Sequence, residues 1–308
     1  MSDFISSGWA WFVGIGTVLS LLACLALLMF AAKRVPMSGG VDDNTTGHVW
    51  DVDLRELNNP LPRWWAWLFV ITLVFAAVYF AFYPGLGSFG GGFKWTSANQ
   101  YEAEQAKARA EMAPLYERLG AMSAADLARD SVAMGVGERL FVNNCATCHG
   151  SDARGSKGFP NLTDGDWLWG GSHEVIKQTI DKGRTGVMPP MAAAVGSAED
   201  VRNLAHYVLS LSGSAHNNIA AQLGRSKFAA CAACHGADGK GNVALGAPNL
   251  TDRIWLHGWG EEAIVTAVNK GINNVMPAQQ GRLTAEQIHV LGAYVWSLSQ
   301  PQAVAARP

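Results

Sequence analysis

The sequence predicts an all-α fold in which two N-terminal transmembrane helices precede two tandem copies of one small helical domain. Three observations support this prediction. Two long apolar runs without a charged residue lie within the first hundred positions, and a block of about 87 residues occurs twice in the remainder. No alternating apolar and polar run is long enough to indicate a sheet.

The composition places part of the chain in lipid. Of the 308 residues 49% are hydrophobic and only 16% are charged, which is less charge than an average soluble protein carries. The formal net charge of -2 gives no basis for a nucleic-acid partner. Four of the five cysteines belong to two short motifs and Cys24 lies in an apolar run, so no disulfide framework is expected.

The first apolar run predicts an uncleaved transmembrane helix. No charged residue occurs from Phe4 to Ala32, and the segment from Trp9 to Ala31 exceeds the roughly 20 apolar residues that span a bilayer. A signal peptide is the alternative. The residues before the run contain Asp3 and no Lys or Arg, however, and the run is long for a signal peptide.

A second uncharged run extends from Trp64 to Phe93, with its most apolar part between Trp67 and Phe82. Tryptophans at its start and Tyr83 at its end occupy positions where aromatic belts meet the two membrane surfaces. We therefore predict a second spanning helix.

The distribution of basic residues predicts the orientation of the two helices. The loop between them contains Lys33, Arg34, Arg55 and Arg63. The segment before the first helix has no Lys or Arg, and the twenty residues from Tyr83 contain only Lys94. The positive-inside rule places the loop in the cytoplasm and both flanking segments outside.

A helical linker is expected after the glycine-rich turn at 85–92. Ser97 to Gln100 has the form of a capping box, and a charged, alanine-rich helix follows until Pro114 kinks or ends it. Because this helix is polar on most sides, it is interpreted as a surface helix or spacer.

Two copies of a Cys-x-x-Cys-His motif carry the chemistry of the chain. They are Cys145, Cys148 and His149 in the first copy and Cys231, Cys234 and His235 in the second. Two thiols one helical turn apart can each add across a haem vinyl group, and the following histidine then lies beneath the iron, so we predict two covalently bound haem c groups. A zinc site or a redox dithiol is the alternative, but zinc would need further ligands nearby and a dithiol would not need the histidine.

The residues around the two motifs repeat with them. Gly137, Phe141, Pro160, Trp167, Gly183 and Tyr207 recur as Gly224, Phe228, Pro248, Trp255, Gly271 and Tyr294. Each copy ends in an amphipathic helix, and the second of these opens with a capping box at Thr284. The predicted domains are a membrane anchor at 1–93, a linker at 94–131, and the two repeats at 132–214 and 215–302.

Met188 and Met276 are the candidate axial ligands opposite the histidines. Met188 lies 39 residues after His149 and Met276 lies 41 after His235, and each is followed by proline. A methionine that fills a gap in the core is the alternative. Histidine and methionine together close the iron to other ligands, which suits electron transfer. By default each methionine is expected to serve the haem of its own repeat, although an exchange between the repeats stays open.

Each repeat resembles a class I cytochrome c in its Gly-x-x-x-Phe pattern, its Pro-Asn-Leu segment and its Met-Pro loop. The resemblance implies that Gly137 and Gly224 allow a close crossing of the first and last helices. It also implies that the carbonyl groups of Pro160 and Pro248 accept a hydrogen bond from the axial histidines.

The loop between the apolar runs carries a second resemblance. Residues 46–51 (TGHVWD) and 54–65 (LRELNNPLPRWW) resemble the N-terminal region of the dihaem subunit III of cbb3-type cytochrome c oxidase, which has the same order of anchor and haem domains. Many members have only the second helix, so the first suggests an additional lipid or subunit contact. The resemblance implies electron relay from a soluble or membrane-anchored cytochrome c, through this chain and a membrane monohaem cytochrome c subunit, to a haem-copper catalytic subunit.

No catalytic centre is expected in this chain, because it has no cluster of histidines in a transmembrane helix to hold haem b or copper. Cytochrome c maturation takes place outside the bacterial cytoplasmic membrane, so the haem domains are expected in the periplasm, in agreement with the charge distribution. Two other functions stay open. They are a free-standing or dehydrogenase-linked membrane dihaem carrier, and a dihaem peroxidase, against which two axial methionines count.

Overall fold

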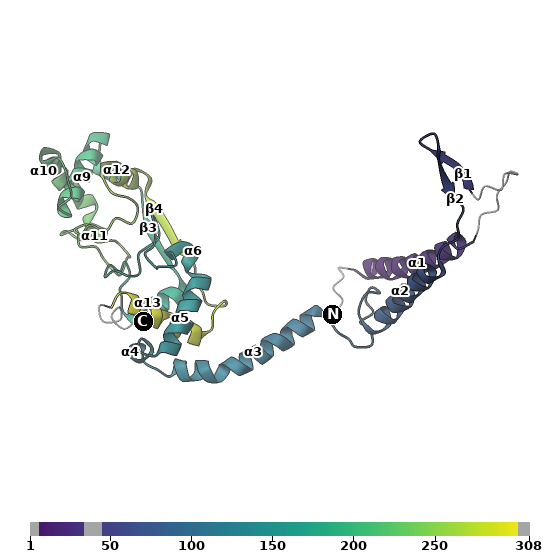
Figure 1. Cartoon of the computed structure of the whole chain (residues 1–308). Helices are drawn as coiled ribbons and strands as arrows, with labels where there is room; N and C mark the ends of the chain where they lie inside the picture. The colour runs from purple at the N-terminus through teal and green to yellow at the C-terminus, as the bar shows by residue number, and fades with distance from the viewer. Residues whose placement is uncertain (1–5, 34–44, 301–308) are drawn as a thin grey trace. The chain divides into compact units, whose positions relative to one another are not determined.

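The computed structural model describes residues 6–33 and 45–300 of the chain. They form two compact units whose boundary falls between Glu111 and Met112 (Figure 1). Parts of three predicted features lie outside the described residues: Phe4 of the first apolar run, Arg34 of the cytoplasmic loop, and residues 301–302 of the second repeat.

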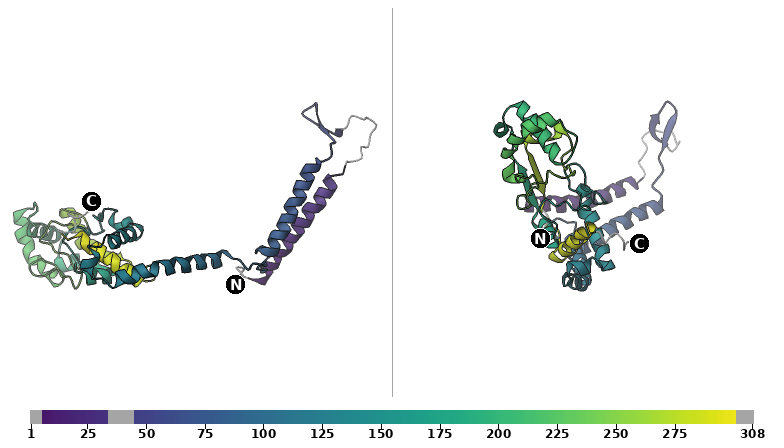
Figure 2. Two further views of the ribbon diagram at one scale, coloured as in Figure 1. Left: turned by 60° about the horizontal axis from the view of Figure 1, so that its bottom comes forward. Right: turned by 90° about the vertical axis from the view of Figure 1, so that its left-hand side faces the viewer.

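Both apolar runs form long helices in the first unit. Helix α1 (Ser7–Ala31) has 25 residues and α2 (Arg63–Phe82) has 20, and the two lie alongside each other (Figure 2). At 1.5 Å per residue each is at least about 30 Å long, the thickness of the hydrocarbon core of a bilayer. By length and composition both helices can cross a membrane, as the sequence predicted.

A short hairpin between the two helices departs from the all-helical prediction. Strand β1 (Thr45–Trp50) pairs with β2 (Leu54–Leu57) in antiparallel register, with Trp50 opposite Leu54. The apolar side chains of this hairpin are exposed on both of its faces. Its sequence therefore lacks the alternation of apolar and polar residues that would have predicted a strand.

Helix α3 (Ser97–Gly120) follows the glycine-rich turn, and its first turn is capped one residue earlier than predicted. The Oγ1 atom of Thr96 accepts a hydrogen bond from the backbone N–H of Asn99 at 3.0 Å, so the predicted capping box that begins at Ser97 is wrong. Pro114 lies inside the helix and does not end it, because the helix continues to Gly120.

The last turns of α3 belong to the second unit. Together with α4 (Ala124–Leu127) they contribute Leu119 and Leu127, both fully buried, to a cluster with Val290 and Ala293 of the C-terminal helix. His289 of that helix adds a hydrogen bond of 2.9 Å to the carbonyl oxygen of Met122. Only the first part of α3 therefore has the solvent-exposed character expected of a spacer.

The second unit is mainly helical. Its further elements are α5 (Ser131–Asn144), α6 (Ala146–His149), α7 (His173–Lys182), β3 (Arg184–Met188), α8 (Ala192–Val195), α9 (Ala198–Leu211), α10 (Asn218–Arg225), the 3-10 helix η1 (Ser226–Ala230), α11 (Ala232–His235), α12 (Glu261–Lys270), β4 (Ile272–Met276) and α13 (Ala285–Leu298). The capping box predicted at Thr284 is present at the start of α13.

The helices assemble into two lobes that do not coincide with the two sequence repeats. Lobe 1 combines α5, α6 and α7 of the first repeat with α13 of the second. Lobe 2 combines α9 of the first repeat with α10, α11 and α12 of the second. In Figure 1 the yellow helix α13 accordingly lies beside the teal helix α5. The repeat boundaries at 132–214 and 215–302 remain a sequence-based prediction. The core of each lobe contains residues from both repeats.

A two-stranded ribbon connects the lobes. Strands β3 and β4 pair in antiparallel register, with Arg184 opposite Met276 and Met188 opposite Ile272. Gly183 ends α7 with φ +71°, and a Cβ atom there would collide with the carbonyl of Met276. Glycine is required at this helix end because both the left-handed backbone and the close approach exclude a side chain.

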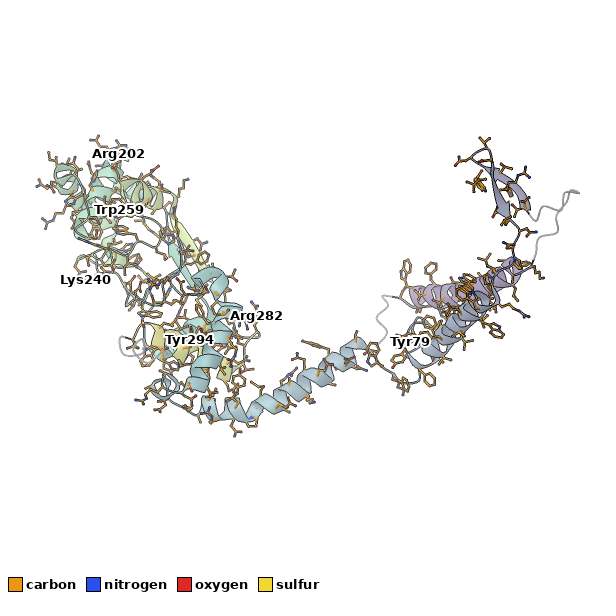
Figure 3. All side chains as sticks on the ribbon, in the orientation of Figure 1. Tyr79, Arg202, Lys240, Trp259, Arg282 and Tyr294 are labelled. Carbon is orange, nitrogen blue, oxygen red and sulfur yellow. The ribbon has the colours of Figure 1, made fainter. Side chains whose placement is uncertain are left out.

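Two glycines allow the close helix crossings that the resemblance implied, but each crossing joins different repeats. A Cβ atom at Gly137 of α5 would lie 2.5 Å from the Cβ atom of Tyr294 in α13 (Figure 3). A Cβ atom at Gly224 of α10 would collide with the backbone of α9 at Asn203. Each first helix therefore crosses the last helix of the other repeat.

Gly137→Ala is expected to destabilise lobe 1. Alanine improves helix propensity by about 1 kcal/mol, but overpacking against the Cβ and ring atoms of Tyr294 costs about 1–3 kcal/mol. Gly135→Ala in the same helix is the matched control, since its new Cβ atom meets only the flexible end of Arg139 at 3.6 Å. Thermal melting of the haem-loaded protein, followed by circular dichroism, measures both. Equal melting temperatures for the two variants would contradict the close crossing.

Candidate functional site

The two Cys-x-x-Cys-His motifs adopt the same local structure in the two lobes. Cys145 precedes the single turn of α6, and Cys231 precedes the single turn of α11. The second cysteine of each motif, Cys148 or Cys234, is exposed, and none of the cysteines is in a disulfide. Each motif therefore presents two free thiols one helical turn apart.

The motif histidines are buried and fixed through one ring nitrogen. The Nδ1 atom of His149 lies 3.0 Å from the carbonyl oxygen of Pro160, and Nδ1 of His235 lies 3.0 Å from that of Pro248. A carbonyl can only accept, so Nδ1 carries the proton and Nε2 keeps its lone pair for a metal. These are the contacts that the cytochrome c resemblance implied.

The segment between His149 and Pro160 is held by backbone hydrogen bonds. Gly150 turns the chain out of α6 with φ +78°, and the N–H of Gly155 donates to the carbonyl of His149 at 2.7 Å. The equivalent bond in lobe 2, from Gly241 to His235, measures 2.8 Å. Each loop thus folds back over its own histidine and positions the proline carbonyl.

The raised pKa values of the first thiol in each motif argue against dithiol redox chemistry. Burial, with a smaller contribution from Cys148, raises the pKa of the Cys145 thiol to about 11, and burial also raises the pKa of Cys231. Reactive dithiols have lowered pKa values. Within residues 6–33 and 45–300, no group of three or more His, Cys, Asp or Glu side chains could hold a metal, so the zinc alternative gains no support there.

The two candidate methionines lie in exchanged lobes. Met276 packs against the lobe 1 core, as does Cys145, and Met188 packs against the lobe 2 core, which includes Cys231. This packing favours an exchange of the two methionines over the expectation that each serves its own repeat. The reason is the β3–β4 ribbon, which carries each methionine across to the other lobe.

Backbone hydrogen bonds fix this exchange. The residue three positions after each methionine is tied to a helix of the other repeat. The N–H of Gln279 donates to the carbonyl of Ile180 in α7 at 2.9 Å, and the N–H of Met191 donates to Val268 in α12 at 2.8 Å. The two bonds occupy equivalent positions, so the exchange is reciprocal.

The residues present fit a haem c group in each lobe. Lobe 1 brings together Cys145, Cys148, His149 and Met276, and lobe 2 brings together Cys231, Cys234, His235 and Met188. Two buried polar atoms have no protein partner among the described residues, Nε1 of Trp255 in lobe 2 and Oε1 of Gln279 after Met276. Such atoms are expected where a further group or water completes the site.

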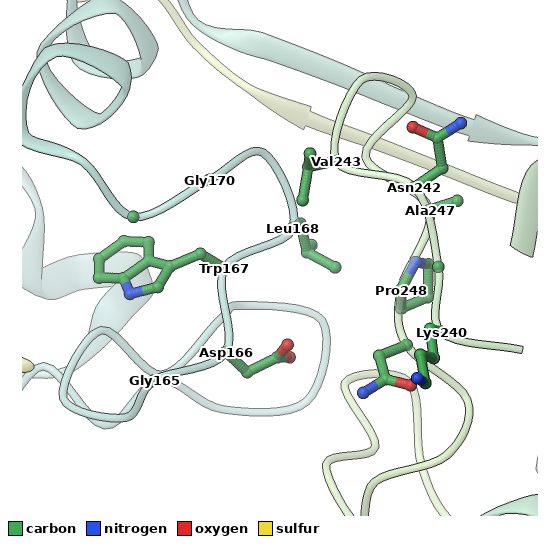
Figure 4. A pocket seen from close by; sticks show the side chains of 13 residues that line it. Gly165, Asp166, Trp167, Leu168, Gly170, Lys240, Asn242, Val243, Ala247 and Pro248 are labelled. Atoms are coloured by element: carbon green, nitrogen blue, oxygen red, sulfur yellow. The ribbon is translucent and has the colours of Figure 1, made fainter.

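A cavity of about 580 Å³ lies between the lobes, lined by residues 165–168, 170–171, 240–243 and 247–249 (Figure 4). Asp166 extends from one wall and Lys240 from the other. Burial, followed by the negative charges of Asp252 and Asp164, raises the pKa of the Asp166 carboxyl. No sequence motif marks Asp166; the only signal is that the second repeat has Ile254 at the equivalent position.

Comparison with known protein families matches most of the chain. Residues 42–90 match the model described as the N-terminal domain of cytochrome oxidase-cbb3, FixP. Residues 133–208 and 220–295 each match the model described as cytochrome C oxidase, cbb3-type, subunit III. The two subunit III matches fall on the two predicted repeats.

Individual relatives show the same similarity. The chain is 63% identical over 307 residues to the cbb3-type cytochrome c oxidase subunit CcoP of Rubrivivax gelatinosus, with 100% of each chain covered. It is 40% identical to subunit FixP of Azorhizobium caulinodans, covering 88% of this chain and 98% of the relative. It is 41% identical to FixP of Bradyrhizobium diazoefficiens, covering 82% and 94%.

Asp166→Asn is expected to raise the melting temperature of the haem-loaded protein near neutral pH. The pKa of Asp166 is higher in the folded than in the unfolded state, so the folded state binds the proton more tightly and loses stability as pH rises through that pKa. The asparagine of the variant does not ionise, so the variant avoids this loss of stability. The difference in melting temperature between the variant and the parent protein should shrink as pH is lowered to about 4, where the carboxyl of the unfolded parent chain also takes up a proton.

Asp152→Asn provides the control for this measurement. Asp152 is exposed and lies 3.9 Å from Arg154, so the same change of charge there should leave the melting temperature nearly unchanged. A pH-independent gain in the Asp166 variant would contradict the role of its ionisation.

Proposed function

Because the chain belongs to the subunit III family of cbb3-type cytochrome c oxidase and is its dihaem electron-transfer subunit, we propose that it carries electrons from a cytochrome c donor to the oxygen-reducing part of the oxidase. The donor is a soluble or membrane-anchored cytochrome c. The observation that carries this proposal is the paired construction of each lobe, which contains two thiols, a buried histidine and a methionine from the other repeat.

Four cysteines and four axial side chains have defined roles in this proposal. In lobe 1, Cys145 and Cys148 form the thioether bonds, and His149 and Met276 ligate the iron. In lobe 2, the same roles fall to Cys231 and Cys234, with His235 and Met188 as the axial pair. The bound haem supplies an iron that holds or releases one electron. The Pro160 and Pro248 carbonyls keep the histidine Nδ1 atoms protonated, and so leave Nε2 available.

Oxygen reduction is assigned to another subunit. A histidine and a methionine in each lobe would occupy both axial positions of a bound haem iron, which would suit electron transfer and not oxygen binding. Neither α1 nor α2 contains a histidine that could hold haem b or copper. We assign oxygen chemistry to a haem-copper catalytic subunit, which electrons reach through a membrane monohaem cytochrome c subunit.

The membrane anchor supports a bacterial inner-membrane location. The chain is a subunit of a membrane complex and has two helices of spanning length. Lys33, Arg55 and Arg63 between the spans favour a cytoplasmic loop, so the haem lobes are placed in the periplasm. A free-standing dihaem carrier would not explain why residues 42–90 match the N-terminal domain of an oxidase subunit.

The assembly is tested by isolating the complex in mild detergent through a tag on this chain. A pyridine haemochrome spectrum and copper analysis should find haem b and copper together with haem c, and the complex should consume oxygen with a reduced cytochrome c as donor. Replacing His149 by alanine should lower that oxygen consumption at least about tenfold, because the relay loses one iron ligand. Haem c alone in an intact preparation would favour the free-standing carrier.

Exchange of the axial methionines is tested in proteins that keep one haem. After Cys145→Ala and Cys148→Ala only the lobe 2 haem is attached. Adding Met188→Ala should then abolish the methionine-to-iron charge-transfer band of the oxidised protein, and adding Met276→Ala should preserve it. The complementary protein, with Cys231→Ala and Cys234→Ala, should give the opposite result. If each methionine instead ligates within its own repeat, both results are reversed.

A further inference from the structure

Two kinds of loop meet where the lobes contact each other. One kind lies between a motif histidine and the proline that holds it, and we call it the histidine loop (150–159 in lobe 1, 236–247 in lobe 2). The other follows the Pro-Asn-Leu segment, and we call it the tryptophan loop (165–171 in lobe 1, 253–259 in lobe 2). Residues of a tryptophan loop and a histidine loop also line the cavity between the lobes (Figure 4).

The ribbon between the lobes relates the two sets of loops. At its centre Gly186 of β3 pairs with Asn274 of β4, its own equivalent in the second repeat. The lobes are therefore related by an approximate two-fold axis, and the contact between a histidine loop and the tryptophan loop of the other lobe is expected twice.

The first of these contacts is made by the backbone. The N–H of Gly158, in the histidine loop of lobe 1, donates to the carbonyl of Leu256 in the tryptophan loop of lobe 2 at 2.8 Å. Lys157 lies beside this bond, since a Cβ atom at Gly258 would be 3.6 Å from its Cε atom. A hydrogen bond thus joins the two loops directly.

The second contact is made by an indole ring. Gly246 is the equivalent of Gly158, because each lies two residues before the proline of its loop. A Cβ atom at Gly246 would collide with the ring of Trp169, in the tryptophan loop of lobe 1. Trp169 is aligned with His257, so the first contact has no indole at this position. One side chain therefore fills the space between the two loops.

Trp169 is held in place from its own lobe. The Cζ atom of Arg184, at the start of β3, lies 5.1 Å from the centre of the ring, a favourable position for a cation on an indole. The Nε atom of Arg184 donates to Oγ1 of Thr179 at 2.9 Å, and Nη2 donates to Oε1 of Gln178 at 3.0 Å. The end of α7 thus fixes the guanidinium, and the guanidinium holds the ring.

The ring lies between segments that belong to the two candidate haem sites. Trp167, two residues before Trp169, packs against the lobe 1 core. Gly246 lies two residues before Pro248, whose carbonyl oxygen is 3.0 Å from Nδ1 of His235. A displacement of the ring therefore acts on the loop that holds the lobe 2 histidine.

We propose that Trp169 is a positioning residue for electron transfer between the lobes, because its contact with Gly246 fixes the orientation of the two haem sites relative to each other. The inference rests on the proposed function and adds to it a residue that controls the step between the two sites. In that step one electron leaves the reduced iron of one lobe and arrives at the oxidised iron of the other, and no bond breaks. Its rate depends on how closely and how constantly the two sites are held.

The test uses four variants of the full chain in the oxidase complex. Trp169→Ala removes the ring, and Trp169→Phe keeps a smaller aromatic ring in its place. Gly246→Ala places a methyl group where the ring lies. Gly158→Ala is the matched control: φ is +87° there and +66° at Gly246, so alanine strains the backbone at either position, but at Gly158 its Cβ atom meets nothing within 4 Å.

The orientation is measured by circular dichroism of the haem-loaded chain in the Soret region, where neighbouring haem groups couple and the signal depends on their mutual orientation. The coupled signal should change in Trp169→Ala and Gly246→Ala, and should keep the parent form in Trp169→Phe and Gly158→Ala. A chain with Cys145→Ala and Cys148→Ala carries one haem and supplies the uncoupled baseline.

The rate is measured by mixing the fully reduced complex with oxygen and following oxidation of the haem c groups. The slowest phase requires transfer between the lobes. It should slow at least about fivefold in Trp169→Ala and Gly246→Ala, and less than about twofold in Trp169→Phe and Gly158→Ala. The methionine-to-iron charge-transfer band should persist in all four variants, because no iron ligand is changed.

The inference is overturned if Trp169→Ala keeps either the Soret signal or the slowest phase of the parent protein, or if Gly158→Ala changes both as much as Gly246→Ala does. Failure of the proposed function gives a different pattern, since oxygen would then not oxidise the haem c groups of the parent complex. The Soret signal of the full chain needs no oxidase activity and decides the role of Trp169 in that case.

Discussion

The pairing of β3 with β4 is the interaction on which the haem-bearing unit depends. Ten residues form this ribbon, and it carries the chain out of lobe 1 and later back into it. Each lobe receives its methionine segment and its last helix through this crossing. Gly183 and Gly271, the two glycines before the strands, make the crossing possible. The backbone turns there with φ +71° at both positions, a conformation that glycine adopts without strain. The two haem sites are therefore parts of one structure and not independent modules.

Much of the site could be predicted from sequence because its determinants are local. The Cys-x-x-Cys-His spacing fixes a single helical turn, and the proline carbonyls meet the histidines within 13 residues of chain. The two spanning helices also follow directly from their unbroken apolar runs. Such features need only nearby residues and physical rules of short range.

The exchange between the repeats could not be predicted because the repeats resemble each other too closely. Helix α9 and helix α13 carry apolar residues at the same spacing, and the sequence around Gly137 and Gly224 does not specify which of the two helices each glycine meets. A pattern of apolar residues specifies that a helix is buried, but it does not specify which of two equivalent surfaces buries it. The prediction of a helix cap at Ser97, where the structure has it at Thr96, has a simpler cause, since two adjacent hydroxyl residues offered two possible caps.

The course of the chain through the two lobes has a consequence for biogenesis. Lobe 2 is built from one continuous stretch, from Met188 to Lys270, and is inserted into lobe 1 as a circularly permuted copy of the same fold. Lobe 1 is split, because its Cys-x-x-Cys-His motif precedes lobe 2 in the chain and helix α13 follows it. Lobe 1 can therefore close only after the segment that forms lobe 2 has been synthesised, so the motif that comes first in the chain belongs to the lobe that is completed last.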